Sequence, residues 1–258
     1  MILAIDVGNT NIVVGAIDHN RKKVFIERLS TVKTKTEAEY AIDLKIILEL
    51  YHIDPAELKG VIISCVVPQV TSVIRQAVEK IIKRKALLVG PGVKNGLNIK
   101  MDNPASVGSD QIVDAVAVVE EYALPAIVID MGTASTMSVI DEKKNYIGGV
   151  IMPGVKVSLE SLTANASQLH GISLDAPKKV IGTNTIDCMQ SGVINGNAAC
   201  LDGMIERIQD ELGKKCTVVA TGGLAKVIVP FCKQKVILDD DLLLKGLRII
   251  YDKNQEKH

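Results

Sequence analysis

Aromatic residues and net charge are both scarce in this chain of 258 residues. Aromatic side chains make up 3% of the sequence, Trp is absent, and 30 Lys and Arg balance 30 Asp and Glu. A nucleic-acid binder typically carries a basic patch interleaved with aromatic residues. Because the sequence has no such patch and no basic arm, we predict no nucleic-acid partner.

Features of export, membrane insertion and cysteine chemistry are also missing. The chain reaches Asp6 before an apolar run long enough for a signal peptide, and no run approaches the ~18 apolar residues of a membrane span. The five cysteines are widely spaced without a C-x-x-C pair, so we predict ordinary buried thiols rather than disulfides or a zinc site. These absences predict a cytoplasmic protein with no membrane partner.

What the sequence does contain is an alternation of strand and helix patterns. At about 100 to 200 residues a domain, the length fits one large domain or two ordinary ones. Short apolar runs separated by turn residues predict strands, and apolar side chains at helical spacing predict helices. Helices are expected at residues 37–51, 70–84, 110–122, 187–212 and 240–251, and strands at residues 2–5, 12–17, 24–29, 60–67, 86–89, 126–129, 136–140, 146–152 and 217–220. We therefore expect an α/β protein whose first three strands are antiparallel.

The opening pattern returns in the second half of the chain. Asp6-Val7-Gly8-Asn9-Thr10 and Asp130-Met131-Gly132-Thr133-Ala134 each follow an apolar strand and lead into a second strand and a polar hairpin turn. Their first residues lie 130 − 6 = 124 positions apart, about half the chain. Solenoids repeat every ~20 to 50 residues, so this spacing instead predicts two domains of the same topology. We expect these domains at residues 1–120 and 121–258.

Both D-x-G turns have the composition of a phosphate loop. Gly8 and Gly132 lack a Cβ, so a phosphate could approach the main chain and accept hydrogen bonds from its N–H groups. Asp6 and Asp130 follow apolar strands, where a carboxylate can hold hydrated Mg2+ against the phosphates. Such turns are common singly, and it is their duplication in matched contexts that favours nucleotide binding.

A third glycine turn supports the nucleotide hypothesis. Gly222-Gly223 follows a predicted strand, and an adenine or ribose could lie against its bare backbone. Two better-known nucleotide motifs are absent: no G-x-x-x-x-G-K-[ST] occurs, and the glycines of residues 90–96 are one residue too far apart for G-x-G-x-x-G.

With these turns the chain resembles the sugar kinase, actin and chaperone ATPase superfamily, and within it the type III pantothenate kinases. The motifs that carry the closer resemblance are Asp6 to Asn11, Asn103-Pro104, Val107 to Asp110, Asp130 to Ala134, Gly148-Gly149, Pro153-Gly154, Ile181 to Thr185, Gln190 to Gly192 and Ala220 to Ala225. The resemblance implies two related actin-like ATPase (ribonuclease H-like) domains with mixed β-sheets flanked by helices. It also implies transfer of the γ-phosphoryl group of ATP to the primary hydroxyl of pantothenate, the first step toward coenzyme A.

The resemblance further implies cofactors, a homodimer and a set of site residues. Family members use a divalent metal such as Mg2+ with ATP and a monovalent cation, K+ or NH4+. By position, Asp110 matches the catalytic base and Asp130 the monovalent-cation ligand, while Asp6 is expected to hold Mg2+ through water. The expected ATP contacts are Asp6, Val7, Gly8, Asn9, Thr10, Asn11, Ile12, Val13, Thr133, Gly222 and Gly223. The expected pantothenate contacts are Met101, Gly108, Ser109, Asp110, Gln111 and Thr185.

Three positions depart from the family pattern. The substrate loop usually reads Gly-Ala-Asp-Arg but here reads Gly108-Ser109-Asp110-Gln111, and Met101 replaces a Tyr. Gln brings no charge to the substrate carboxylate, a loss of about 1.5–3 kcal/mol unless Lys100 or Lys156 compensates. Two alternatives stay open: a kinase for a different small hydroxylated substrate, and a non-catalytic nucleotide-binding relative with a regulatory role. For Asp110 itself, the alternative is a structural N-cap of the helix that starts there.

Overall fold

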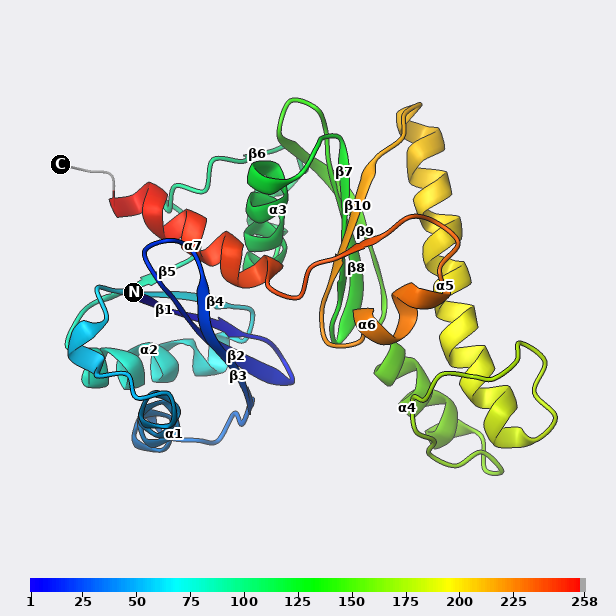
Figure 1. Cartoon of the computed structure of the whole chain (residues 1–258), viewed down its shortest axis with the longest axis horizontal. Coiled ribbons are helices and arrows are strands. Elements are labelled where there is room, and N and C mark those ends of the chain that lie inside the picture. Colours follow the sequence, from blue (N-terminus) through cyan, green and yellow to red (C-terminus); the bar gives the residue numbers. More distant parts are fainter. Residues whose placement is uncertain (256–258) are drawn as a thin grey trace. The chain divides into compact units, whose positions relative to one another are not determined.

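The computed structural model describes residues 1–255, which form two compact units. The first unit consists of Met1–Leu97, Asn103–Ala117 and the residues from Asp241 on. The second consists of Asn98–Asp102 and Val118–Asp240. Each unit is built on one mixed β-sheet, and helices pack on both sheets (Figure 1).

The sheet of the first unit has five strands in the order β3-β2-β1-β4-β5. They are β1 (Ile2–Val7), β2 (Asn11–Ile17), β3 (Lys23–Ser30), β4 (Val61–Cys65) and β5 (Ala86–Leu88). Neighbours β1, β2 and β3 pair antiparallel, as predicted, whereas β4 and β5 extend the sheet in parallel. The parallel pairing places the carboxyl ends of β1 and β4 side by side.

Helices cover both faces of this sheet. They are α1 (Glu37–Leu50), α2 (Pro68–Ile82), the first part of α3 (Ser109–Glu121) and α7 (Leu242–Gln255), with 3-10 turns at Pro55–Glu57 and Pro104–Ser106. Odd-numbered residues of β1, such as Leu3 and Ile5, pack with α1 and α2, and even-numbered Ile2 and Ala4 pack with α3 and α7. Because side chains alternate along a strand, Asp6 faces the side that α3 and α7 cover.

The second unit repeats this strand order. Its sheet runs β11-β10-β7-β8-β9-β6, so β9-β8-β7-β10-β11 corresponds to β3-β2-β1-β4-β5. The strands are β6 (Asn98–Ile99), β7 (Ala126–Met131), β8 (Ala134–Ile140), β9 (Asn145–Pro153), β10 (Thr217–Thr221) and β11 (Ile237–Leu238). Asp6 and Asp130 each stand one residue before the end of the central strand, as the duplication predicts.

One long helix dominates the packing of the second unit. The helices are α4 (Val155–Asn165), α5 (Thr185–Leu212) and α6 (Ala225–Ile228), with a 3-10 turn at Val229–Phe231. Ile194, Leu201 and Ile205 of α5 are buried in one cluster with Ile127 and Ile129 of β7. The sequence predicted α5 almost to the residue, but it gave no sign of α4.

The expected domain limits need correction at the C-terminus. Residues 121–258 were expected to form the second domain, but α7 belongs to the first unit. Its residues Leu244, Leu247 and Ile250 are buried in one cluster with Ile2 and Ile62, so its apolar face completes the first unit's core. The boundary within α3 falls after residue 117 rather than after residue 120, and residues 256–258 lie outside the described part of the chain.

The cysteine prediction was partly wrong. All five are free thiols, as expected, but Cys188 and Cys200 are exposed on α5 and Cys65, Cys216 and Cys232 are partly exposed. Cys188 and Cys200 are exposed because they lie outside the row of buried residues on α5. Among the described helices, none combines the length and the apolar character that a bilayer crossing would require.

Candidate active site

The first D-x-G turn connects β1 to β2 and is closed by its own backbone. Gly8 N–H donates to the Asn11 carbonyl at 3.0 Å, and Thr31 Oγ donates to the Gly8 carbonyl at 2.7 Å. Thr31 N–H also donates to the Thr10 carbonyl at 2.9 Å. The Gly8 N–H is therefore used within the turn, so the N–H groups that a phosphate could reach are other ones of this turn. Asn9, Thr10 and Asn11 are exposed at the tip, where a ligand can reach them.

The apolar residues expected at this loop lie below the tip. Val7 and Ile12 are buried in the core of the first unit, and Val13 is partly buried. Val7 and Ile12 therefore offer a ligand almost no exposed surface. These two residues hold the turn on the sheet, and polar residues are exposed at its tip.

Asp6 lies beside the end of β4. The carboxylate residue is 7% exposed, and the parallel register places it directly opposite Ser64. Ser64 is fully buried and stands two residues beyond Ile62, which faces α3 and α7. By the alternation of side chains, Asp6 and Ser64 face the same side of the sheet.

Asp110 lies in the first turn of α3. Its Oδ1 accepts a hydrogen bond from Gln111 N–H at 2.8 Å, and Gln111 Oε1 accepts one from Gly108 N–H at 3.3 Å. Burial raises the pKa of Asp110, and the donation from Gln111 N–H opposes this shift. The helix begins at Ser109, so Asp110 lies inside the first turn and not at the N-cap. Asp110 is partly buried, and a carboxylate with a raised pKa is suited to accept a proton.

The neighbours of Asp110 fix its place. A Cβ on Gly108 would overlap Asp110 Oδ1, so the carboxylate occupies space that only glycine leaves open. Ser109 Oγ lies 2.9 Å from Ser64 Oγ, and it accepts a hydrogen bond from Cys65 N–H at 3.1 Å. These contacts join the start of α3 to the end of β4. The residue next to Asp110 is thereby bonded to Ser64, the register neighbour of Asp6.

The second D-x-G turn, between β7 and β8, is also closed by its glycine N–H, but it is one residue shorter than the first. Gly132 N–H donates to the Ala134 carbonyl at 3.1 Å, so this N–H is also used within its turn. Gly154 N–H donates to the Thr133 carbonyl at 3.2 Å, and a Cβ on Gly154 would lie 2.6 Å from the Gly132 oxygen. The segment that starts α4 thus packs directly behind the turn. Gly132 and Thr133 remain exposed.

Asp130 lies next to the third glycine turn. The parallel register pairs Asp130 with Thr221, and Gly222 follows with φ of +95°. A Cβ on Gly222 would lie 2.5 Å from Asp130 Oδ1. The second unit therefore brings Asp130 and the Gly222-Gly223 turn together, as a nucleotide site requires, and Gly223 is exposed there.

The remaining predicted substrate residues, Met101 and Thr185, lie in the second unit. Met101 is partly exposed, whereas Thr185 is exposed as the first residue of α5. Thr185 lines a largely apolar cavity of about 700 Å3, together with Leu159, Leu162 and Met189. Met101 is not among the residues that line it.

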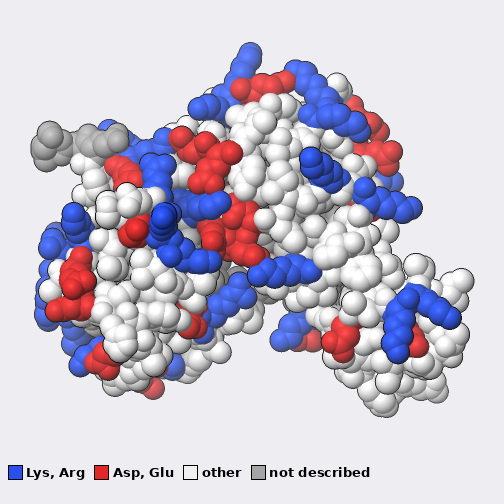
Figure 2. Space-filling model, in the orientation of Figure 1, with Lys and Arg blue, Asp and Glu red and all other residues white. Residues whose placement is uncertain are grey.

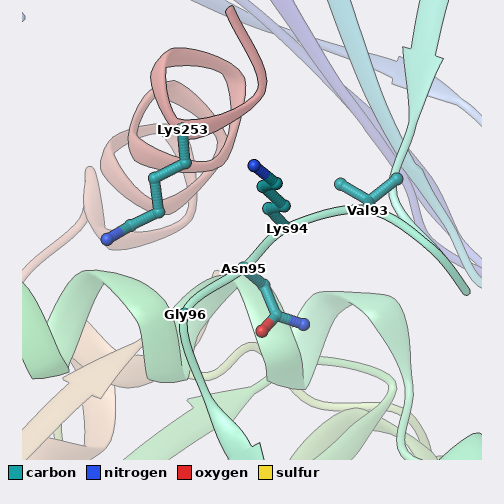
Figure 3. Close-up of a pocket in the computed structure, with 5 residues that line it drawn as sticks. All are labelled: Val93, Lys94, Asn95, Gly96 and Lys253. Carbon is teal, nitrogen blue, oxygen red and sulfur yellow. The ribbon is translucent and has the colours of Figure 1, made fainter. Parts of the chain in front are cut away.

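A second cavity, of about 520 Å3, contains none of the predicted site residues. It lies in the first unit and is lined by Val93, Lys94, Asn95, Gly96 and Lys253 (Figure 3). Figure 3 shows the Lys94 and Lys253 side chains pointing in different directions from a loop and from α7. Since the two cations do not converge, we assign no ligand to this cavity.

Neither concentrated positive charge on the drawn face (Figure 2) nor a cluster of metal ligands among the described residues marks the site. On the face drawn in Figure 2, Lys and Arg are interspersed with Asp and Glu rather than gathered in one basic field. Within residues 1–255, no group of three or more His, Cys, Asp or Glu side chains could hold a metal. Mg2+ commonly binds one or two carboxylates together with phosphate oxygens and waters. Single carboxylates such as Asp6 and Asp130 therefore fit an ion that arrives with a nucleotide better than a resident metal.

Sequence reasoning missed the residues that brace the site. Thr31 and Ser64 bond to residues 23 and 45 positions away, and no local motif marks them. Gly154 belonged to a recognised motif, but its packing against the Gly132 turn was not foreseen. A strand-register model would have found Ser64, because it is the direct neighbour of Asp6.

Comparison with known proteins bears on this geometry. A family model described as type III pantothenate kinase matches residues 2–207. A type III pantothenate kinase from Halalkalibacterium halodurans is 45% identical over 254 residues, 98% of this chain and 100% of the relative. One from an Exiguobacterium species is 44% identical over 256 residues, 99% of this chain and 100% of the relative.

A solved structure supports the fold. The activator of 2-hydroxyisocaproyl-CoA dehydratase from Clostridium difficile, solved with bound ADPNP, matches with a TM-score of 0.58 at 12% identity. The match covers 98% of this chain and 94% of that chain. Together with the repeated strand order, it confirms the expected α/β fold of two related units with mixed sheets flanked by helices.

Proposed function

This chain belongs to the type III pantothenate kinase family, and from that membership we propose the reaction and the roles of its residues. The protein transfers the γ-phosphoryl group of ATP to the primary hydroxyl of pantothenate, which gives 4'-phosphopantothenate at the first step of coenzyme A biosynthesis. Phosphoryl transfer depends mainly on positioning and on stabilising charge. The residues therefore have to orient the hydroxyl, accept its proton and hold the triphosphate.

The partly buried carboxylate of Asp110 carries this proposal. Asp110 accepts the proton of the pantothenate hydroxyl as phosphoryl transfer proceeds. Its burial, its raised pKa and its fixed place over Gly108 support that role. A protein that only senses a nucleotide has no use for a base, so these features favour the enzyme over the regulatory alternative.

We assign ATP binding to the two D-x-G turns and the third glycine turn. In the first unit the tip residues Asn9, Thr10 and Asn11 contact phosphate oxygens, over a backbone shaped by Asp6 to Val13. In the second unit Thr133, Gly222 and Gly223 contact the nucleotide. Exposure of these residues next to the ends of the central strands supports the assignment.

Two cations complete the nucleotide site in this proposal. Mg2+ neutralises the phosphates, and Asp6 holds it through water, because a single buried carboxylate fits an ion that keeps most of its waters. Asp130 binds a monovalent cation, K+ or NH4+. Its place beside Gly222, whose missing Cβ lets the backbone of the glycine turn approach Oδ1 closely, supports this assignment.

The pantothenate loop comprises Gly108 to Gln111, with Met101 and Thr185 as further contacts. Gln111 replaces the usual Arg, and its Oε1 already accepts the Gly108 N–H. Its Nε2 still has N–H groups for the substrate carboxylate, though without charge. This observation keeps a different small hydroxylated substrate as the second candidate. We also predict that Lys100 or Lys156 supplies the charge that Gln111 lacks. This prediction is wrong if Lys100→Ala and Lys156→Ala both leave the KM for pantothenate unchanged.

We also propose a homodimer. Apolar side chains near the start of α5 and on β9 are largely exposed: Ile151 is 74%, Val180 72%, Ile181 80% and Ile186 57% exposed. Burial against a second copy would remove this surface from water. Light scattering on the purified protein should give a mass near twice 27.7 kDa. The cytoplasmic location stays a prediction, to be tested by cell fractionation.

One assay tests the function. Purified protein is incubated with Mg2+, ATP and pantothenate, with K+, NH4+ or neither, and 4'-phosphopantothenate is quantified. We expect turnover that one of the monovalent cations stimulates, and a loss of about 10²- to 10⁴-fold in Asp110→Asn, the range of a general base. Asp210→Asn, which neutralises an exposed carboxylate on α5, is the matched control and should keep full activity.

The outcomes separate the candidates. No turnover of pantothenate in any cation would contradict the leading proposal. ATP-dependent phosphorylation of another small alcohol would then support the second candidate. Full activity in Asp110→Asn would leave the kinase in place but remove the proposed base.

A further inference from the structure

Ser109 is the first residue of α3 and stands next to Asp110. The Ser109 hydroxyl lies 2.9 Å from Ser64 Oγ and accepts the Cys65 N–H at 3.1 Å. It is thus the direct bonded link between the helix that carries Asp110 and the sheet that carries Asp6.

The surroundings of this link make it consequential. Ser64 is fully buried, so its hydroxyl depends on a protein partner. The parallel pairing of β4 with β5 ends at Ile63 and Leu88, which leaves the Cys65 N–H beyond the ladder. Ser109 Oγ is the partner that the structure gives to both groups. Removal of this one oxygen would therefore leave two polar groups at the end of β4 in need of new partners.

We propose that Ser109 is a positioning residue for the phosphoryl-transfer reaction, and that its hydroxyl holds the first turn of α3 against the end of β4 and so fixes where the Asp110 carboxylate lies relative to the sheet. The inference rests on the proposed role of Asp110 as base. Ser109 does not touch the reacting atoms in this account. It acts by holding the backbone from which the Asp110 carboxylate projects.

Other contacts of the loop do not duplicate this link. Gln111 Oε1 bonds to Gly108 N–H, and Asp110 Oδ1 bonds to Gln111 N–H. Both bonds lie within four consecutive residues, so they shape the turn without attaching it to the sheet. Ser109 therefore sets where the turn lies, whereas Gln111 sets its shape.

The test compares Ser109→Ala with Ser109→Thr, which keeps a hydroxyl, and with Ser64→Ala, which removes the partner. Ser106→Ala is the matched control, because its exposed hydroxyl bonds only to the neighbouring Asn103 carbonyl at 2.7 Å. For each variant kcat, the KM for ATP and the pH profile of kcat are measured. We expect Ser109→Ala to lower kcat about 5- to 20-fold, since a displaced base costs rate steeply, and to leave the KM for ATP within about 2-fold.

The pH profile distinguishes positioning from general stability. Asp110 becomes less buried when the turn loosens, so the acid limb of the profile should move to lower pH in Ser109→Ala and in Ser64→Ala. Ser109→Thr should restore at least half of the lost kcat, and Ser106→Ala should match the wild type. If Ser109→Ala does not fold, Ser64→Ala carries the same expectation from the other side of the bond.

Failure of this inference is distinct from failure of the proposed function. Suppose that the wild type is active and Asp110→Asn is not. If Ser109→Ala and Ser64→Ala then both keep the wild-type kcat and the wild-type acid limb of the pH profile, the positioning role is overturned. An inactive wild type, or an active Asp110→Asn, refutes the proposed function instead.

Discussion

Replacement of Gly108 by alanine tests whether the exact place of the Asp110 carboxylate matters. A Cβ on residue 108 would overlap Asp110 Oδ1, inside the 3.0 Å below which real Cβ contacts are essentially never found. The clash is with the end of a side chain and not with backbone, so the fold can absorb it by moving that carboxylate. In doing so, Asp110 loses the hydrogen bond from Gln111 N–H at 2.8 Å.

Gly108→Ala should affect the rate of catalysis much more than the stability of the fold. Misplacement of a catalytic group by about 1 Å can cost 10²-fold in rate, so we expect kcat to fall about 10- to 100-fold. The stability cost is that of alanine at a helix N-terminus, about 1 kcal/mol or less. In a protein of this size such a cost lowers Tm by about 2–4 °C.

The assay measures kcat, the KM for ATP and Tm for Gly108→Ala beside Gly171→Ala. A Cβ on Gly171 meets no atom within 4 Å, so this control should change none of the three. If Gly108→Ala keeps the wild-type kcat while folded, the carboxylate can be displaced without consequence, and the assignment of Asp110 as base is refuted.

Three further predictions follow from particular contacts. Asp110→Asn should raise Tm at pH 7, because burial raises the pKa of Asp110 above its ordinary 3.8 and so disfavours the charged carboxylate in the folded protein. Protonation of Asp110 stabilises the folded state at low pH, and this stabilisation is lost as the pH rises through the folded-state pKa. The increase in Tm caused by the asparagine should therefore shrink toward pH 4 in a series of thermal melts. Gly222→Ala should cost about 2–4 kcal/mol in urea unfolding, since it combines φ of +95° with a contact 2.6 Å from a backbone nitrogen. Gly213→Ala, with φ of +65° and no atom within 4 Å, should cost only about 1–2 kcal/mol, and equal costs would contradict this account. Thr31→Val removes the 2.7 Å hydrogen bond to the Gly8 carbonyl, so the KM for ATP should rise about 5-fold, and an unchanged KM would mean that the first turn does not need this brace.

The sequence predicted what depends on local pattern and on repetition. Apolar periodicity placed nine of the eleven described strands and predicted the long helix over residues 187–212, where the structure has Thr185–Leu212. The duplicated D-x-G turns predicted that Asp6 and Asp130 would stand at equivalent strand ends. These features are local, because side-chain alternation and turn chemistry act over a few residues.

The parts that the sequence did not predict depend on contacts between distant residues. That Gly8 and Gly132 use their own N–H groups to close the two turns was not foreseen. The brace from Thr31 and the link from Ser64 to Ser109 follow from strand register and helix docking, which a single sequence does not encode visibly. The same holds for α7, whose amphipathic pattern predicts a helix without saying which sheet it covers.

That placement of α7 has a consequence for synthesis of the chain. Ile2 and Ala4 of the first strand share a buried cluster with Val113 and Val116 of α3 and with Leu244 and Leu247 of α7, so α3 alone covers this side of the sheet until α7 is translated. Domains commonly fold in N-terminal order as the ribosome adds about 5–20 residues per second. Here the order is partly reversed, because the residues of the second unit end at Asp240 and are translated before α7. Until α7 emerges from the exit tunnel, the nascent first unit exposes the part of this apolar face that α7 covers.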